Sequence, residues 1–170
     1  MNLINLLLAF KYPAVFISAS FEGPVTMAAV GFLFKLGYFA LWPAYIALLL
    51  GDLAGDIGWY LLGKHGAHRF VRRFGKYFDL TEEKIQNIAP LFRKHEGKIL
   101  FLSKMTMGFG FAVAILFTAG MSRVPLKKFI FLNILGGLPW TALVLFLGYT
   151  FGNIYLRVSN GLHIATLAFS

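Results

Sequence analysis

Residues 38–63 read YFALWPAYIALLLGDLAGDIGWYLLG, an apolar run interrupted by only two charged side chains, Asp52 and Asp56. A helix of this length, rising about 1.5 Å per residue, can cross the roughly 30 Å hydrocarbon core of a bilayer. Residues 128–151 form a second segment of the same kind. Aromatic residues typical of membrane interfaces lie near the ends of the two segments: Trp42, Tyr60 and Tyr149. We therefore expect an all-α, polytopic membrane protein in which these two segments are plain spans.

The composition favours a membrane protein and excludes several other classes. Of the 170 residues, 58% are hydrophobic and 14% are charged, against about 25% charged in ordinary soluble domains. The chain has no cysteine, which excludes disulfide scaffolds, thiolate metal sites and cysteine nucleophiles. Basic loops beside anionic lipid headgroups explain the net charge of +9 better than nucleic acid does. Residues 1–170 are expected to form a single domain of the cell membrane.

The most polar stretch, residues 64–98, predicts the orientation of the chain. It carries nine Lys and Arg residues against four acidic ones. A short loop with this excess faces the cytoplasm by the positive-inside rule. Apolar residues at helical spacing, from Ile85 to Phe92, predict an amphipathic helix on the membrane surface, in contact with anionic headgroups.

Residues 99–121 have the length of a span but are interrupted by Lys104 and by glycines. If they crossed the membrane, the basic residues within 123–128 would lie on the side opposite residues 64–98, against the positive-inside rule. A re-entrant hairpin keeps both basic clusters on one side, with the irregular backbone lining a cavity. We therefore favour a hairpin over a span for this segment.

A second hairpin is predicted for residues 12–35, where Glu22-Gly23-Pro24 separates two short apolar arms. The chain then has two halves, residues 12–63 and 99–152, each a hairpin followed by a span, and a C-terminal helix at residues 153–170. The segments GDLAGDIGWYLLG and GGLPWTALVLFLG both have glycine ends twelve positions apart and an internal tryptophan. Two such halves, entering from opposite sides, form the inverted repeat of many transporters. Small-residue helix faces would also allow a homodimer.

Charged residues inside apolar sequence are the candidate functional residues, because each costs about 2.5 to 3.5 kcal/mol to insert. Lys104 is the expected cation of an anion site, with Glu22 as its counter-charge or as a proton carrier. Backbone amides at the hairpin breaks would complete a headgroup site, and the residues expected there are Thr106, Gly108, Gly110 and Gly23. Two alternatives stay open: Glu22 and Lys104 form a purely structural ion pair, or Lys104 extends to the nearby interface.

Asp52 and Asp56 are four residues apart and therefore share one helix face. Repulsion between them favours a state in which one is protonated or paired with a cation. We assign both residues to proton coupling or headgroup contact. For Asp56 the alternative is a position near the interface, beside Lys64.

The sequence contains no recognisable catalytic or cofactor site. His65, His68 and His95 lack carboxylate or cysteine partners at ligand spacing, so no metal site is expected. No glycine-rich loop continues into the Lys-Ser/Thr pattern of a phosphate-binding loop, and no serine lies in the context of a catalytic nucleophile. We expect a protein that is not an enzyme and that needs no cofactor.

Motifs with charged residues and glycines follow one another between residues 21 and 152. They are Phe21-Glu22-Gly23-Pro24, Gly51-Asp52-x-x-Gly55-Asp56-x-x-Trp59-Tyr60-x-x-Gly63-Lys64, Phe101-x-x-Lys104, Ala119-Gly120-Met121 and Phe129-x-x-x-Asn133-x-x-Gly136-x-x-x-Trp140. In this order they resemble the DedA family of membrane proteins, also called VTT-domain proteins. The resemblance implies two re-entrant hairpins that face each other and an activity in moving lipids, such as undecaprenyl phosphate or phospholipid, across the bilayer. Lys104 stands where many members carry an arginine, and a lysine offers a point charge rather than a bidentate phosphate contact.

The leading hypothesis is therefore translocation of a lipid phosphate, coupled to protons through Glu22 and Asp52. One alternative is a small-ion or solute transporter that uses the same carboxyl groups as a cation site. It predicts ion-dependent flux without lipid movement. Another is a membrane organiser that transports nothing, in which the acidic residues should tolerate substitution.

Overall fold

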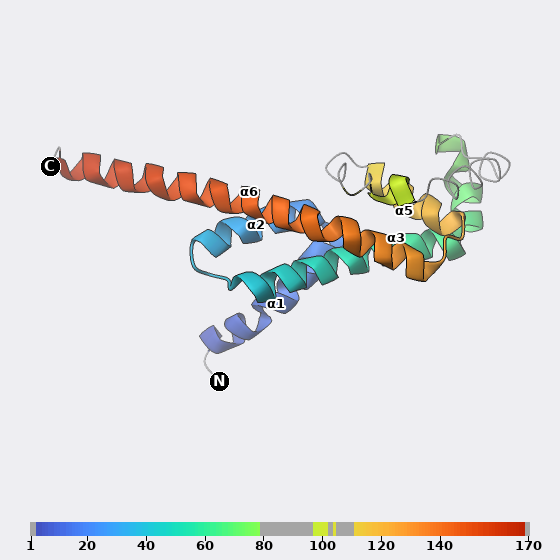
Figure 1. Cartoon of the computed structure of the whole chain (residues 1–170), viewed down its shortest axis with the longest axis horizontal. Coiled ribbons are helices and arrows are strands. Elements are labelled where there is room, and N and C mark those ends of the chain that lie inside the picture. The colour runs from blue at the N-terminus through green and yellow to red at the C-terminus, as the bar shows by residue number, and fades with distance from the viewer. Residues whose placement is uncertain (1–2, 79–96, 102–103, 105–110, 169–170) are drawn as a thin grey trace. The chain divides into compact units, whose positions relative to one another are not determined.

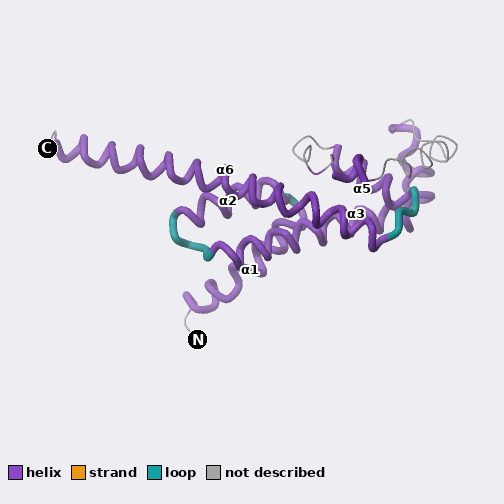
Figure 2. Tube along the Cα trace, in the orientation of Figure 1, coloured by secondary structure: helices purple, strands orange, loops and turns teal. Residues whose placement is uncertain are grey.

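The computed structural model describes residues 3–78, 97–101, 104 and 111–168, and these are almost entirely helical (Figures 1 and 2). The helices are α1 (Leu3–Phe21), α2 (Gly23–Lys35), α3 (Leu41–Phe78), α5 (Phe111–Met121) and α6 (Leu126–Ala168). No strand occurs within these described ranges, which confirms the all-α prediction. Two helical segments there are long and apolar enough to cross a membrane, Leu41–Gly66 and Leu126–Leu156.

Both long helices continue past the predicted ends of their spans. Helix α3 runs on from Gly63 to Phe78, into the basic stretch that was predicted as a loop, and α6 includes most of the predicted C-terminal helix, residues 153–170. At Lys64 the side chains become polar but the helix continues. No proline follows Pro43 before the end of α3, so nothing in the sequence interrupts the helix. The amphipathic helix predicted between Ile85 and Phe92 lies outside the described residues.

The chain forms two compact units that do not coincide with the two halves of the sequence. The first unit contains residues 1–51 and 141–170, and the second contains residues 52–140. Helices α3 and α6 therefore contribute to both units.

In the first unit, α1 and α2 pack against each other on either side of a break at Glu22 (Figure 1). Pro24 stands in the first turn of α2, where its missing N–H costs nothing and its fixed φ favours a new helix start. A hydrogen bond of 2.9 Å between the hydroxyl groups of Ser18 and Thr26 joins the two arms. The predicted break in residues 12–35 is confirmed.

The second arm of this pair, α2, packs closely on α6 within the same unit. A Cβ atom on Gly31 would overlap the carbonyl oxygen of Leu145, and one on Gly148 would overlap that of Ala28. At each glycine the backbone of the opposite helix occupies the place of a side chain, a contact typical of helix pairs in membranes.

The second unit contains the same kind of helix pair, formed by α3 and α5. A Cβ atom on Gly63 would overlap the carbonyl oxygen of Phe117, and one on Gly120 would overlap that of Tyr60. Tyr60 is fully buried in this unit's core, so its predicted place at a membrane interface is wrong. The core residues are Tyr60, Leu100, Leu116, Ala119, Val124 and Phe129.

The glycine ends of the two similar sequence segments make corresponding contacts. Gly51 meets the backbone of Phe16 in α1, and Gly136 meets Lys104 on the segment that precedes α5. The glycines twelve positions further on, Gly63 and Gly148, meet α5 and α2 respectively. The first glycine of each segment thus contacts a first arm, α1 or the segment that precedes α5, and the second glycine contacts the second arm of the other pair, α5 or α2. The faint sequence repeat therefore has a structural counterpart.

The second arms also end in the same way. The turn after α2 contains Gly37, with φ of 85°, and the turn after α5 contains Arg123, with φ of 54°. In both turns the next residue donates its N–H to a carbonyl one turn back, Tyr38 to Leu33 at 3.1 Å and Val124 to Ala119 at 3.2 Å. This is the Schellman ending, which usually has glycine at its left-handed position.

Candidate functional site

The candidate site is built on one face of α3 in the second unit. Asp52, Asp56 and Tyr60 follow one another at intervals of four residues, which places them on the same side of the helix. All three are buried. The spacing that predicted a shared face for the two aspartates therefore places both carboxyl groups inside this unit.

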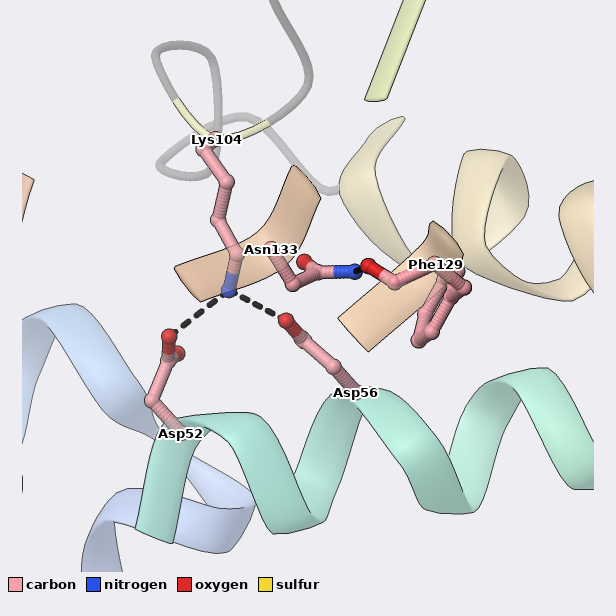
Figure 3. Close-up of polar contacts among 5 residues, drawn as sticks. All are labelled: Asp52, Asp56, Lys104, Phe129 and Asn133. Atoms are coloured by element: carbon pink, nitrogen blue, oxygen red, sulfur yellow. Dashed lines mark hydrogen bonds and ion pairs between the residues drawn. The ribbon is translucent and has the colours of Figure 1, made fainter. Parts of the chain in front are cut away.

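The ammonium group of Lys104 lies between the two carboxyl groups (Figure 3). Its Nζ donates a hydrogen bond to Asp52 Oδ2 at 2.7 Å and forms an ion pair with Asp56 Oδ2. The exposed fractions are 1% for Lys104, 4% for Asp52 and 3% for Asp56. We call these three residues the ion cluster.

The ion cluster carries more acidic than basic groups. In the part of the chain that the structure describes, Lys104 is the only cation paired with Asp52 and Asp56. With all three groups ionised, the net charge is therefore −1. A buried uncompensated charge costs several kcal/mol, so the arrangement favours the arrival of one more positive charge, a proton or a cation.

Helix α6 closes the cluster from the opposite side with Asn133 and Gly136. A Cβ atom on Gly136 would lie 3.2 Å from Cγ of Lys104, so a larger residue would displace the lysine stem by a few tenths of an ångström. Asn133, one turn earlier and 2% exposed, donates from Nδ2 to the carbonyl oxygen of Phe129 at 3.1 Å. Its Oδ1 has no hydrogen-bond partner within the described chain. A buried acceptor thus remains unsatisfied on the face of α6 that meets Lys104.

Tyr60 and Phe129 form an apolar floor next to the cluster. Their ring centroids lie 4.6 Å apart, and the Tyr60 hydroxyl donates to the carbonyl oxygen of Val124 at 2.5 Å. This hydrogen bond satisfies the only polar atom of the tyrosine side chain and ties α3 to the turn between α5 and α6. The floor keeps water away from the charges and so strengthens the ion pairs.

A family model for the VTT domain matches residues 21–150, most of the chain, from the last residue of α1 into α6. The chain belongs to the VTT-domain, or DedA, family. The match includes the whole ion cluster together with Glu22, Asn133 and Gly136.

Three named relatives of this VTT-domain protein are 27% to 29% identical to it over the aligned residues. Undecaprenyl phosphate transporter A of Bacillus subtilis is 27% identical over 136 residues, which cover 80% of this chain and 68% of the relative. Inner membrane protein YohD of Escherichia coli is 29% identical over 91% of this chain and 77% of the relative. Protein DedA of Escherichia coli is 28% identical over 68% of this chain and 51% of the relative. No solved structure matches the chain.

The structure of this VTT-domain protein brings together three of the predicted site residues. Asp52, Asp56 and Lys104 form the ion cluster, and the burial of Asp56 disfavours its alternative place near the interface. Glu22 and Gly23 belong to the first unit, where Glu22 is an exposed residue at the start of α2 and Gly23 is buried. The remaining predicted residues, Thr106, Gly108 and Gly110, lie outside the described residues.

Sequence reasoning missed the partner of Lys104. It assigned Glu22 as the counter-charge, whereas the structure pairs Lys104 with the two aspartates. The signal was present, because two carboxyl groups at four-residue spacing need a cation or a proton. Asn133 and Gly136 were noted as parts of a motif but not as site residues; the only hint was a polar and a small residue three apart in an apolar helix. Among the described residues no group of three or more His, Asp or Glu side chains could hold a metal ion.

Proposed function

We propose that this protein moves a lipid with a phosphate headgroup, such as undecaprenyl phosphate or a phospholipid, across the cell membrane. The observation that carries the proposal is the ion cluster: a buried lysine held by two buried aspartates on a candidate membrane-spanning helix. Charges placed in membrane segments at this cost mark substrate or ion pathways. Kinship with a protein named as an undecaprenyl phosphate transporter supports the choice of substrate.

We further propose that residues 12–35 and residues 99–121 form re-entrant hairpins in two inverted halves. Support comes from the break at Glu22, from the matching glycine contacts and from the matching ends of α2 and α5. In this arrangement residues 64–98 face the cytoplasm, and their basic side chains contact anionic headgroups. A small-residue position that no other helix of the described chain covers, Gly58 on α3, makes a homodimer part of the same proposal.

In this mechanism the ammonium group of Lys104 exchanges an aspartate for the phosphate of the lipid. Lys104 must loosen at least one of its two ion pairs before its ammonium group can hold a phosphate. A proton that binds to Asp52 or Asp56 removes one of the negative charges and weakens the hold on Lys104. Lys104, with backbone amides of Thr106, Gly108 and Gly110, then receives the headgroup, and departure of the proton returns the lysine to the aspartates. Glu22 supplies a further proton-binding carboxyl group.

The test is exchange of labelled undecaprenyl phosphate and of labelled phospholipid between leaflets of proteoliposomes, with and without a pH gradient. We expect the wild-type protein to accelerate exchange of at least one of these lipids. Glu22→Gln and the charge-free variant Asp52→Asn/Asp56→Asn/Lys104→Met should both remain folded and lose this activity. Folding is checked by helix content and by thermal unfolding in detergent.

Two results would overturn the proposal. Exchange at the wild-type rate by the folded charge-free variant would remove the ion cluster from the mechanism. Absence of lipid exchange by the wild-type protein, together with ion flux in the same vesicles, would favour a cation transporter. That second function has one observation in its favour, the excess negative charge of the cluster.

A further inference from the structure

An apolar groove of about 520 Å³ runs along the first unit between α1 and the start of α3. Its walls include Tyr12 and Phe16 on one side and Trp42, Ile46 and Leu50 on the other. Ligand sites commonly have volumes of about 300 to 1,000 Å³ and mostly apolar walls. The groove shares no residue with the ion cluster, so a ligand could occupy it whether or not the protein translocates lipid.

The groove has the length of one lipid leaflet. Trp42, Ile46 and Leu50 lie at intervals of four residues, so they line about 12 Å of helix α3. One leaflet contributes about half of the roughly 30 Å hydrocarbon core. Trp42 is 72% exposed and stands at the start of the candidate span Leu41–Gly66, the usual position of an interfacial aromatic residue.

A fixed positive charge marks one end of the groove. Nζ of Lys11 donates to the carbonyl oxygen of Tyr38 at 3.2 Å and lies 5.0 Å from the ring centroid of Tyr12 and 5.7 Å from that of Phe39. Tyr12 is itself a wall residue. The ammonium group is therefore held where the groove reaches the start of the span, at the depth of lipid headgroups.

We propose that this groove binds an anionic glycerophospholipid of the surrounding bilayer, with an acyl chain along α3 and the phosphate beside Lys11. The apolar walls match a hydrocarbon chain, and the charge of Lys11 complements an anionic headgroup. A lysine near an anionic membrane surface contributes about 1 kcal/mol, which corresponds to roughly fivefold selectivity over a zwitterionic lipid. The bound lipid covers the exposed side chains of Trp42, Ile46 and Leu50.

Fluorescence quenching of Trp42 by brominated lipids tests this site. The chain has three tryptophans, so Trp59→Phe/Trp140→Phe leaves Trp42 as the only one. This variant is reconstituted in bilayers that contain brominated phosphatidylglycerol or brominated phosphatidylcholine in graded proportions. We expect the site at Trp42 to bind phosphatidylglycerol roughly fivefold more tightly than phosphatidylcholine.

Three further variants in the single-tryptophan background locate the effect. Lys11→Gln should reduce the selectivity to about onefold, because it removes the charge and leaves the groove. Ala47→Phe, which fills the groove, should weaken quenching by both brominated lipids. Lys35→Gln is the matched control: Lys35 also lies over an aromatic ring, that of Tyr149, but lines no part of the groove, so selectivity should remain.

Three outcomes would overturn the proposal. Equal quenching by both brominated lipids in the parent variant would mean ordinary boundary lipid. Little quenching by either lipid, together with a disulfide-linked dimer of an Ile46→Cys variant after addition of an oxidant, would assign the groove to a dimer interface. Displacement of brominated phosphatidylglycerol by stoichiometric undecaprenyl phosphate would assign it to a polyprenyl lipid instead.

Discussion

Gly63 of α3 and Gly120 of α5 form a reciprocal contact, in which each glycine faces the backbone of the other's helix. A side chain on Gly63 would overlap the carbonyl oxygen of Phe117, and one on Gly120 would overlap that of Tyr60. Tyr60 lies one turn beyond Asp56, so this helix pair also fixes the part of α3 that carries the ion cluster. The contact therefore links the packing of the second unit to its chemistry.

Replacement of either glycine by alanine should destabilise the protein. Because a backbone oxygen and not a flexible side chain occupies the space, the helices must move apart, at a cost of about 1 to 3 kcal/mol. Gly58→Ala is the control, since nothing lies within 4 Å of its new methyl group and the alanine favours the helix by up to about 1 kcal/mol. Thermal unfolding in detergent should show lower midpoints for Gly63→Ala and Gly120→Ala only. Equal midpoints for all three variants would contradict the close approach of α3 and α5.

Arg123→Gly should stabilise the protein. Arg123 has φ of 54°, and a non-glycine residue in this left-handed region costs about 1 to 2 kcal/mol. The charge that would be lost stabilises the end of α5 by about 0.3 to 1 kcal/mol. This is less than the strain that is relieved, so the net effect should be stabilising. Arg123→Lys, which keeps both charge and strain, should leave the unfolding midpoint unchanged, and Gly37→Ala should lower it. A lower midpoint for Arg123→Gly would mean that the interactions of the arginine side chain stabilise the protein by more than its left-handed backbone destabilises it.

A single replacement in the ion cluster should destabilise the protein more than the combined replacement of all three residues. Lys104→Met alone leaves Asp52 and Asp56 buried without a cation, and breaking a buried pair in this way costs about 3 to 5 kcal/mol. Adding Asp52→Asn and Asp56→Asn removes that charge and should restore most of the lost stability. The unfolding midpoints of the single and triple variants in the same detergent check this. A triple variant no more stable than Lys104→Met would show that packing, and not charge, dominates.

Asn133→Leu should lower the rate of lipid exchange without lowering the stability of the protein. Its Nδ2 hydrogen bond to Phe129 is worth about 1 kcal/mol, and removal of the unsatisfied Oδ1 together with added apolar burial offsets this loss. We expect an unfolding midpoint close to that of the wild type but a fall of about tenfold in lipid exchange. The reason is that Oδ1 is an unsatisfied acceptor on the face of α6 that meets Lys104, and we expect it to accept from the ammonium group when an ion pair to the aspartates opens. Asn153→Leu, elsewhere on α6, is the matched control and should retain exchange. Wild-type exchange by Asn133→Leu would exclude Oδ1 from the cycle.

Much of the fold follows from local sequence chemistry. The apolar lengths of residues 38–63 and 128–151 predicted the two long helices, and Pro24 after Glu22 predicted the break between α1 and α2. The point at which α3 leaves the apolar region was predicted, but its continuation to Phe78 was not. Hydropathy reports which solvent surrounds a helix and not where its hydrogen bonding stops.

The sequence predicted the two acidic members of the ion cluster but not the cation that pairs with them. Spacing placed Asp52 and Asp56 on one face and required a cation or proton for them. The identity of that cation depends on tertiary packing, because Lys104 is far from both in sequence and reaches them past Gly136. Tyr60 was placed at an interface on composition alone, whereas its hydroxyl finds a partner in the carbonyl of Val124 and the whole ring becomes buried.

The division into two units determines the order in which the nascent chain can complete its folding. Residues 52–140 are continuous, so every segment of that unit has left the ribosome before the segments after residue 141 emerge. The other unit contains both ends of the chain. Gly31 of α2 can contact the backbone of Leu145 only after this part of α6 has been synthesised. The second unit can therefore complete its packing before the first, and a polypeptide that terminates early near residue 140 would present the unpaired face of α2 to insertion chaperones and proteases.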